Sequence, residues 1–360
     1  MSNRPLINYV CGFLNEFGWH WREIAYYDAH GVEKVNLIAV PLQQGISKLK
    51  VDLAFICHTD TVPFAQSWPD ATSLMREGDM LHGCGSCDVK GSLACLLAAI
   101  SEVSTSDVQN SVALIFTADE EIGCIGTSRL LEAEAIVPQC AVICEPTSLR
   151  PAVAGKGYGL ASIRVQGREA HSAFPQQGVS AILVSAKLVS AIENWMQQRD
   201  GASNVLFDPP RTTFNIGRID GGSAKNIIPG SCSFLVEWRP LPEEDPQQIA
   251  AGLQRLAHEI ESSNAGCRIE VDIQRAEAGF ATAGEPHIAS ALSQMLARPL
   301  TGIAFGSEAA RFAKVAKEVV VIGPGDMRTA HSERECVPVV ELEEWKDCLK
   351  QLLIEKIDLA

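Results

Sequence analysis

Short, uninterrupted apolar runs are the feature of this sequence that most restricts its fold. A run of this kind predicts a strand that is buried on both faces, as in a sheet with parallel strands. Segments with a helical spacing of apolar residues separate some of the runs, at 92–103 and 127–135. This alternation predicts an α/β fold in which helices cover both faces of the sheet. The predicted buried strands lie at 35–40, 51–57, 112–117, 140–144 and 319–322.

Acidic and histidine side chains follow these runs at the points where the strands are predicted to end. His58 comes directly after one run, and a glycine-rich turn at 83–87 delivers Asp88 to the start of a helix. Ligands of α/β sheets bind outside the carboxyl ends of the strands, so these side chains can meet at one point. The strand-end residues are His58, Asp60, Asp88, Glu120, Glu121, Glu145 and His331.

Two histidines and several carboxylates suit a pair of Zn²⁺ ions about 3.5–4 Å apart, with one carboxylate as a bridge. The paired Glu120 and Glu121 can divide two tasks, because one side chain can bind metal while its neighbour stays free to move protons. Taken alone, a strand-end histidine or an acidic pair is usually structural or solvated. The repetition of metal-compatible residues at several strand ends favours a metal site.

The pattern changes after residue 155. Strand-like and helix-like segments follow in the order β-α-β-β-α-β, which is the order of a ferredoxin-like unit. We therefore expect an inserted α+β domain at 156–274, within a catalytic domain formed by 1–155 and 275–360. In the last part, a buried strand, a Gly-Pro-Gly turn and then His331 repeat the strand-end theme, which indicates that this part rejoins the first domain.

The composition narrows the possible partners and the cellular compartment. The 360-residue chain has a formal net charge of −14 and no run rich in lysine or arginine, which argues against nucleic acid or an anionic membrane as a partner. Many of its twelve cysteines lie within apolar runs rather than in a short secreted framework. We see neither a signal pattern nor an apolar run of about eighteen residues. We therefore expect a cytoplasmic protein with reduced thiols.

The Cys84-x-x-Cys87 pair has two other interpretations, as a redox pair or as half of a zinc ribbon. The sequence contains no second Cys-x-x-Cys pair. Because the pair falls inside the glycine-rich turn that leads to Asp88, the sequence favours a structural role for it.

Five short motifs occur in the order His58-Thr59-Asp60-Thr61-Val62-Pro63, Gly85-x-x-Asp88-Val89-Lys90-Gly91, Asp119-Glu120-Glu121-Ile122-Gly123, Glu145-Pro146-Thr147 and Ala330-His331. Together they resemble the signature of the co-catalytic zinc aminoacylase and carboxypeptidase family. The resemblance runs from about Arg4 to the end of the chain. It implies a zinc-peptidase-like catalytic domain with a mixed sheet, plus an inserted lid or dimerisation domain. Family members carry about twenty or more residues, with a further helix, before the segment that matches 4–17. Either the start of this sequence is truncated or misassigned, or the domain tolerates an exposed patch where that helix would pack.

The resemblance also implies roles for the strand-end residues. Glu120 would be the general base, and Asp60 would orient His58. The implied reaction is metal-assisted hydrolysis of an amide bond, with two Zn²⁺ ions per subunit and Co²⁺ as an alternative. The implied ligands are His58, Asp88 and Glu145 for one ion, and Asp88 (bridging), Glu121 and His331 for the other.

Three residues of the predicted inserted domain match positions near the family's substrate. His171, in Glu169-Ala170-His171-Ser172, matches a histidine that the family uses near the scissile carbonyl, often from a partner subunit. Asn226 and Arg239 match positions that contact substrate. Asn226 can equally cap a turn, and Arg239 can equally form a strand-end salt bridge. The resemblance further implies a homodimer through the inserted domain.

Local sequence favours one branch of the family. Gly306-Ser307-Glu308-Ala309 and the Gly-Pro-Gly turn at 323–325 resemble the branch that hydrolyses N-acetyl-L-ornithine to L-ornithine and acetate in arginine biosynthesis. The segment 87–91 also resembles the related N-acetylcitrulline deacetylase. A desuccinylase of succinyl-diaminopimelate, and a dipeptidase or carboxypeptidase on the same scaffold, stay open. A binding protein without the chemistry is disfavoured, because all the ligands and Glu120 are present.

Overall fold

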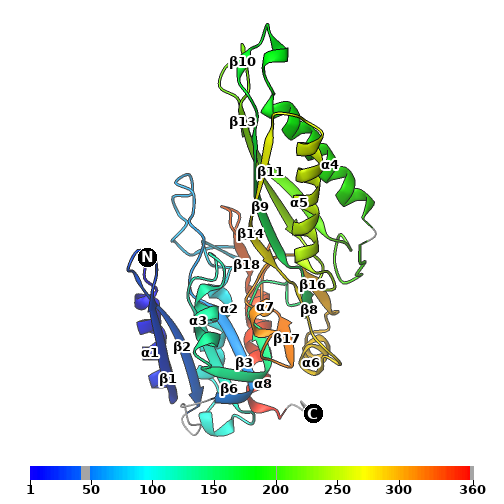
Figure 1. Ribbon diagram of the computed structural model, residues 1–360. Coiled ribbons are helices and arrows are strands. Elements are labelled where there is room, and N and C mark those ends of the chain that lie inside the picture. Colours follow the sequence, from blue (N-terminus) through cyan, green and yellow to red (C-terminus); the bar gives the residue numbers. More distant parts are fainter. Residues whose placement is uncertain (42–48, 200, 357–360) are drawn as a thin grey trace. The chain divides into compact units, whose positions relative to one another are not determined.

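The computed structural model describes residues 1–41, 49–199 and 201–356, which form two compact units (Figure 1). The first unit comprises Met1–Ala154, Ala281–Ile303 and Ser307–Ala360, and the second comprises Gly155–Phe280 and Ala304–Gly306. Each unit has its own hydrophobic core. The second unit continues to Phe280 because its last strand runs on to Glu277, beyond the predicted end at 274.

A mixed sheet forms the centre of the first unit. Among the described residues it has nine strands, in the order β1-β2-β6-β3-β7-β17-β8-β15, with β16 paired to β8. β6, β3, β7 and β17 are parallel, whereas β1, β2 and β8 pair in antiparallel fashion. The strands are β1 Trp19–Tyr27, β2 Glu33–Pro41, β3 Leu49–His58, β6 Val112–Thr117, β7 Ile136–Ile143, β8 Ala152–Gly155, β15 Phe280–Ala281, β16 Thr301–Ile303 and β17 Glu318–Val321.

The burial of these strands follows from their sequences. Every residue of β6 and of β17 is buried, as expected for apolar strands with neighbours on both sides and helices on both faces. β1 lies at the edge of the sheet, and buried and exposed residues are mixed along it. It has no continuous apolar run, and for that reason the sequence did not predict it.

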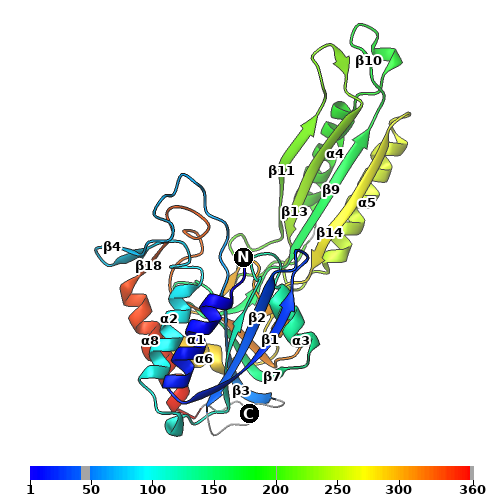
Figure 2. The same ribbon diagram turned by 90° about the vertical axis from the view of Figure 1, so that its left-hand side faces the viewer.

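Helices cover both faces of this sheet (Figure 2). α1, α2, α6 and α8 share one core with the sheet, whereas α3 lies against the other face. α7 packs against β7 and β17. The helices are α1 Arg4–Glu16, α2 Lys90–Ser101, the 3₁₀ turn η1 Thr105–Asp107, α3 Ile125–Glu132, α6 His287–Leu296, α7 Ala309–Phe312 and α8 Val339–Ile354.

A small antiparallel sheet in the same unit joins two distant parts of the chain. Its order is β18-β5-β4, formed by Cys336–Pro338, Met80–His82 and Met75–Glu77. Cys336 pairs with His82, so the segment before β18 lies beside the glycine-rich turn that follows β5.

The second unit is a four-stranded antiparallel sheet with two helices on one face. The strand order is β11-β13-β9-β14, and α4 and α5 share a core with the sheet. Along the chain the elements follow the β-α-β-β-α-β order of a ferredoxin-like unit. Their bounds are β9 Tyr158–Gln166, α4 Ala181–Gln198, β11 Thr213–Gly221, β13 Ser231–Arg239, α5 Pro246–Ser262 and β14 Arg268–Glu277.

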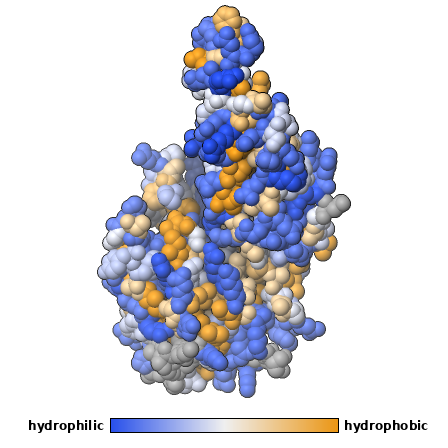
Figure 3. All heavy atoms as spheres, in the orientation of Figure 1, coloured by the Kyte–Doolittle hydropathy of each residue, from blue (hydrophilic) through white to orange (hydrophobic). Residues whose placement is uncertain are grey.

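A separate two-stranded ribbon belongs to the second unit. It consists of β10 (Ala170–His171) and β12 (Ile227–Ile228), followed after β10 by the 3₁₀ turn η2 (Pro175–Gln177). The visible face of this unit is mainly hydrophilic and carries a hydrophobic stripe (Figure 3). In the part of the chain that the structure describes, no helix combines the length and apolar character needed to cross a membrane.

Candidate metal centre

Separate segments of the first unit bring side chains that could bind metal to the carboxyl ends of its parallel strands. His58 is the last residue of β3, and Glu145 follows the end of β7 by two residues. Asp88 ends the glycine-rich turn before α2, and His331 lies on the loop before β18. Within the described residues these side chains form two candidate metal-binding groups, His58–Asp88–Glu145 and Asp88–Glu121–His331, with ligand atoms within 4.8 Å of one another.

The first group surrounds the imidazole of His58. Its Nε2 atom lies 3.0 Å from Asp88 Oδ1 and 3.6 Å from Glu145 Oε1. All three side chains are buried. Ligand atoms about 2.0–2.2 Å from a tetrahedral Zn²⁺ lie about 3.3 Å from one another, so these separations suit a shared ion.

The second group contains the other oxygen of the same aspartate. His331 Nε2 lies 2.9 Å from Asp88 Oδ2 and 3.3 Å from Glu121 Oε2. The hydrogen bonds to Asp88 and Glu121 raise the pKa of His331 to about 10. Asp88 therefore presents one oxygen to each histidine, as a carboxylate that bridges two metal ions does.

The chemistry of this donor set fits divalent cations. Glu121 Oε1 is buried and has no hydrogen-bond partner, and a buried carboxylate oxygen in that state is unfavourable unless a cation binds it. Burial and the charges of neighbouring carboxylates raise the pKa of Glu145 well above its usual value. Although burial lowers the pKa of His58, Glu145 and Asp88 raise it well above its usual value. Nitrogen and carboxylate donors of this kind suit zinc and cobalt.

Asp60, which the resemblance predicts to orient His58, contacts that side chain through its backbone. Its backbone carbonyl, rather than its carboxylate, accepts the 3.0 Å hydrogen bond from His58 Nδ1. That bond leaves Nε2 free to bind metal. The Asp60 carboxylate is 3.7 Å from Nδ1 and accepts hydrogen bonds from the backbone N–H groups of Glu120 (3.2 Å) and Glu121 (3.1 Å). Asp60 thus holds both a ligand and the acidic pair.

Glu120 lies outside both ligand groups, as the proposed division of the acidic pair requires. Burial raises the pKa of its carboxyl to about 8, and the nearby Glu308 and Glu121 act in the same direction while His58 opposes them. Its Oε1 accepts a 3.3 Å hydrogen bond from the thiol of Cys124. A carboxyl group with a pKa near neutrality suits general acid–base catalysis.

The loop that carries the acidic pair is fixed by residues that the sequence did not single out. Asp119 has a φ of 57°, an uncommon conformation for a residue with a side chain. Its carboxylate forms a short ion pair with the buried Lys34 and accepts a 2.8 Å hydrogen bond from Tyr26 Oη. Lys34 and Tyr26 come from β2 and β1, and no local signal in those strands indicates this contact.

The cysteines of the glycine-rich turn take no part in either ligand group. Their thiols face backbone carbonyls, with Cys84 directed at Val62 and Cys87 at Asp326. Every cysteine in the described ranges is free.

In the second unit, the structure brings His171 and Asn226 to the same ribbon. His171 pairs with Ile227, and the Ser172 N–H donates to the Asn226 carbonyl at 3.0 Å. Both residues are exposed. The imidazole Nδ1 of His171 accepts a 3.1 Å hydrogen bond from the Ala173 N–H, so the proton of the neutral ring is on Nε2. His171 can therefore donate a hydrogen bond from Nε2.

Arg239 ends β13 and already has partners within the second unit. Its Nε donates to Glu237 Oε1 at 2.7 Å, and its guanidinium lies 4.5 Å from the centre of the Tyr158 ring. Arg275 covers the same ring at 4.6 Å. Arg239 thus forms the strand-end salt bridge that the sequence left open as its structural role. Its side chain is still 29% exposed, so it can also contact a ligand.

Comparison with known sequences decides the family. The chain matches peptidase family M20/M25/M40 over residues 54–355. The chain belongs to this family. An acetylornithine deacetylase of Myxococcus xanthus is 36% identical over 347 residues, which cover 94% of this chain and 89% of that protein. As a member of the family the protein is a hydrolase, as the motifs predicted.

Solved structures of the family share the fold. A tripeptidase from Staphylococcus aureus superposes with a TM-score of 0.78 at 21% identity, covering 97% of this chain and 91% of the other. A dinuclear metal-binding M20 peptidase from Bacillus subtilis gives 0.67 at 14% identity, covering 96% and 90%. The predicted α/β class, with its central mixed sheet, is thereby confirmed.

Proposed function

We propose that this M20 enzyme hydrolyses the amide bond of an N-acyl amino acid, with N-acetyl-L-ornithine as its substrate and L-ornithine and acetate as products. The observation that carries the proposal is the arrangement of Asp88 between two histidines, with Glu120 beside the ligand groups but outside them. The identity to an acetylornithine deacetylase supports the choice of substrate. The formal charge of −14 favours the cationic ornithine side chain over neutral citrulline. The reaction would serve arginine biosynthesis.

The proposed cofactor is two Zn²⁺ or Co²⁺ ions per subunit. His58, Asp88 and Glu145 would hold one ion, and Asp88, Glu121 and His331 the other. When bound, such a pair supplies Lewis acidity and brings the pKa of a coordinated water toward neutrality.

Glu120 would move the proton in this reaction. Its carboxylate would accept a proton from the attacking water and then return it to the amine that leaves. Burial raises the pKa of Glu120 to about 8, which supports a role as an acid–base group near neutral pH. Glu121 has the same side chain but would be committed to metal binding.

His171 would stabilise the charge that develops on the carbonyl oxygen. Its Nε2–H is available because Nδ1 accepts a backbone hydrogen bond. A hydrogen-bond donor aimed at that oxygen stabilises the transition state more than the ground state. Asn226, on the same ribbon, and Arg239 would contact the substrate.

A substrate panel tests this function. N-acetylornithine, N-acetylcitrulline, succinyl-diaminopimelate and a dipeptide are each assayed with added zinc or cobalt. We expect N-acetylornithine to have the highest kcat/KM, and a chelator to abolish turnover until metal is restored. Faster hydrolysis of the dipeptide would contradict the deacetylase assignment, and elemental analysis should give two ions per chain.

We also propose a cytoplasmic homodimer that forms through the second unit. The edge strand β11 carries the exposed Ile219, and the start of α4 carries the exposed Ile182 and Leu183. Unpaired strand edges and exposed apolar side chains are features of association surfaces. Light scattering after size-exclusion chromatography should give the mass of two chains, and Leu183→Lys should shift it toward one.

A further inference from the structure

Glu335 is a buried carboxylate that belongs to neither ligand group but contacts the backbone of a proposed ligand. Only 2% of the surface of Glu335 is exposed to solvent. A single oxygen, Oε1, accepts hydrogen bonds from the backbone N–H groups of Gly85 (2.9 Å), Cys87 (3.1 Å) and Asp88 (3.1 Å). Backbone N–H groups that converge in a turn form a concave anion site, and here a side chain of the same protein occupies it.

The small sheet of the first unit explains how this contact forms. The pairing of Cys336 with His82 places Glu335 next to the turn, and the Gly83 N–H donates to the Glu335 carbonyl at 3.4 Å. Gly85 has a φ of 83°, which lets the turn direct its N–H groups to one point. Glu335 therefore accepts hydrogen bonds from the glycine-rich turn through both its backbone carbonyl and its side chain.

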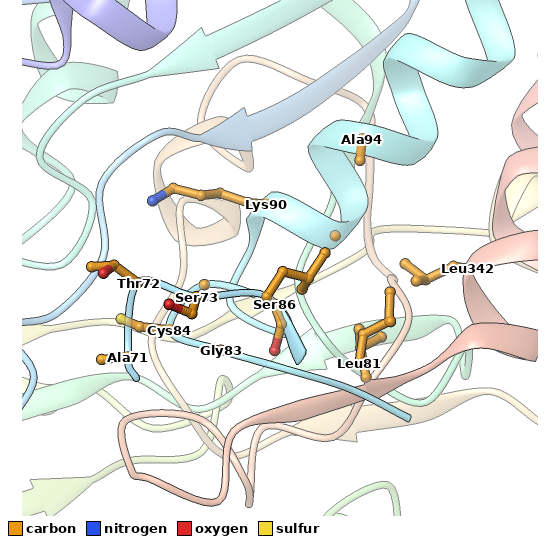
Figure 4. A pocket seen from close by; sticks show the side chains of 14 residues that line it. Ala71, Thr72, Ser73, Leu81, Gly83, Cys84, Ser86, Lys90, Ala94 and Leu342 are labelled. Atoms are coloured by element: carbon orange, nitrogen blue, oxygen red, sulfur yellow. The ribbon is translucent and has the colours of Figure 1, made fainter. Parts of the chain in front are cut away.

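Side-chain packing around the turn is incomplete. Gly83, Gly85 and Ser86 line a largely apolar cavity of about 260 Å³, shown in Figure 4 with Leu81 and Leu342 among its other lining residues. A second cavity of about 260 Å³ is lined by Cys84, Glu335 and other residues. Where a segment borders open space it lacks the dispersion contacts that fix a packed core. The hydrogen bonds to Glu335 must then contribute much of its positional restraint.

We propose that Glu335 is a positioning residue for the metal centre, which fixes the backbone of Asp88 so that its two oxygens face the two histidines. This inference rests on the two-metal part of the proposed function and not on the identity of the substrate. Glu335 lies four residues after His331. The loop before β18 thus carries His331, a proposed ligand of one ion. It also carries Glu335, which supports Asp88, the proposed ligand of both ions.

A second buried glutamate of the first unit provides a matched control. Glu318 is 7% exposed, and its carboxylate accepts hydrogen bonds from the backbone N–H groups of Ile288 (3.1 Å) and Ala289 (2.9 Å) at the start of α6. It has the same chemistry as Glu335 but contacts a helix start rather than the turn of Asp88. Loss of either carboxylate should lower stability, and only loss of Glu335 should weaken metal binding.

The test measures metal binding directly in the full-length protein. Zinc affinity is measured by competition with a chelator, and cobalt is bound to record its electronic spectrum, for the wild type, Glu335→Ala, Glu335→Gln and Glu318→Ala. We expect Glu335→Ala to weaken metal binding by about 10–100-fold and to change the cobalt spectrum. Glu335→Gln keeps a carbonyl acceptor but loses the charge that strengthens its bonds, so its loss should be smaller, about 3–10-fold. Glu318→Ala should melt at a lower temperature yet bind metal as the wild type does.

Each outcome decides the proposal. Wild-type zinc affinity in Glu335→Ala, or an equal loss of affinity in Glu318→Ala, overturns it. If Glu335→Ala does not fold, the zinc affinity of Glu335→Gln decides. Wild-type zinc affinity in Glu335→Gln then overturns the proposal. Failure of the wild type to hydrolyse N-acetylornithine would overturn the proposed substrate and leave these binding measurements intact.

Discussion

The two units hold their candidate residues in different ways. In the first unit, His58, Asp88 and Glu145 are buried, and hydrogen bonds hold His58 and Asp88. His331 is exposed but lies within 3.3 Å of the carboxylates of Asp88 and Glu121. In the second unit, His171 and Asn226 are exposed on a ribbon whose strands have two residues each. Donor atoms that are held in place before the ion arrives bind it more tightly, whereas a group that acts on the substrate is needed only once the substrate is bound.

This contrast separates two kinds of experimental effect. Changes in the first unit should alter metal content, proton transfer or the stability of the metal-free protein. Changes in the second unit should alter turnover or substrate affinity and leave the metal in place.

The largest effect is expected at Glu120. Glu120→Gln should lower kcat by roughly three orders of magnitude or more, because the amide cannot accept the proton of the attacking water. Metal content, measured by elemental analysis, should stay near that of the wild type. Glu121→Gln is the matched variant and should lose metal. If Glu120→Gln lost metal instead, the roles of the two residues would be reversed.

A smaller loss of turnover is expected at His171. Removal of one hydrogen-bond donor to a developing oxyanion lowers kcat by about 10²–10³-fold. His171→Ala should show a loss of this size with two ions still bound, as measured by steady-state kinetics together with elemental analysis. Reduced metal content in this variant would show that the second unit contributes to the metal centre and would break the contrast.

A still smaller effect should separate Arg239 from its neighbour Arg275. Both guanidinium groups cover Tyr158, and each pairs with a glutamate two residues away. If Arg239 contacts substrate, Arg239→Ala should raise KM by about tenfold, the equivalent of one charge-assisted hydrogen bond. Arg275→Ala should leave KM unchanged. Equal effects of the two substitutions would assign Arg239 a purely structural role. Asn226→Ala can be measured in the same series.

The smallest effect concerns the pH dependence of the metal-free protein. Burial raises the pKa of Glu120 from 4.5 to about 8 in the folded chain, so the folded state binds more protons than the unfolded state between these values. Stability is therefore fully present at low pH and is lost as the pH rises through about 8. The melting temperature should fall by roughly 5 °C between about pH 5 and about pH 8. Glu120→Gln should make this slope shallower without removing it, because the raised pKa values of Glu145, His58 and His331 act in the same direction. An unchanged slope would contradict the contribution of Glu120.

Much of the first unit could be predicted from local sequence. Apolar runs without interruption predict buried strands, and β6 has the bounds that its sequence indicates. The edge strand β1 escaped prediction because one side of it is partly exposed, so its residues form neither a continuous run nor a clean alternation. His58, Glu121 and Glu145 were recognisable because they lie at or close behind strand ends, and the family resemblance assigned ligand roles to them and to Asp88 and His331.

The supporting contacts could not be predicted, because they depend on backbone geometry between distant segments. Glu335 and Gly85 are 250 positions apart, and Lys34 and Asp119 are 85 apart. Asp60 was recognised, yet the use of its carbonyl for His58 and of its carboxylate for the acidic pair depends on how two loops meet. Residue type gives the chemistry of a site, and only the fold gives the hydrogen bonds that orient it.

The second unit interrupts the first unit in the sequence, so the two parts of the first unit are synthesised at different times. His58, Asp88, Glu121 and Glu145 leave the ribosome before the second unit, and His331 and Glu335 leave after it. The second unit is nearly continuous in sequence, so most of it can fold as a unit while the chain still grows. β17, which pairs with β7 in the central sheet, also leaves the ribosome after the second unit. Metal capture is therefore one of the final steps in the maturation of the chain.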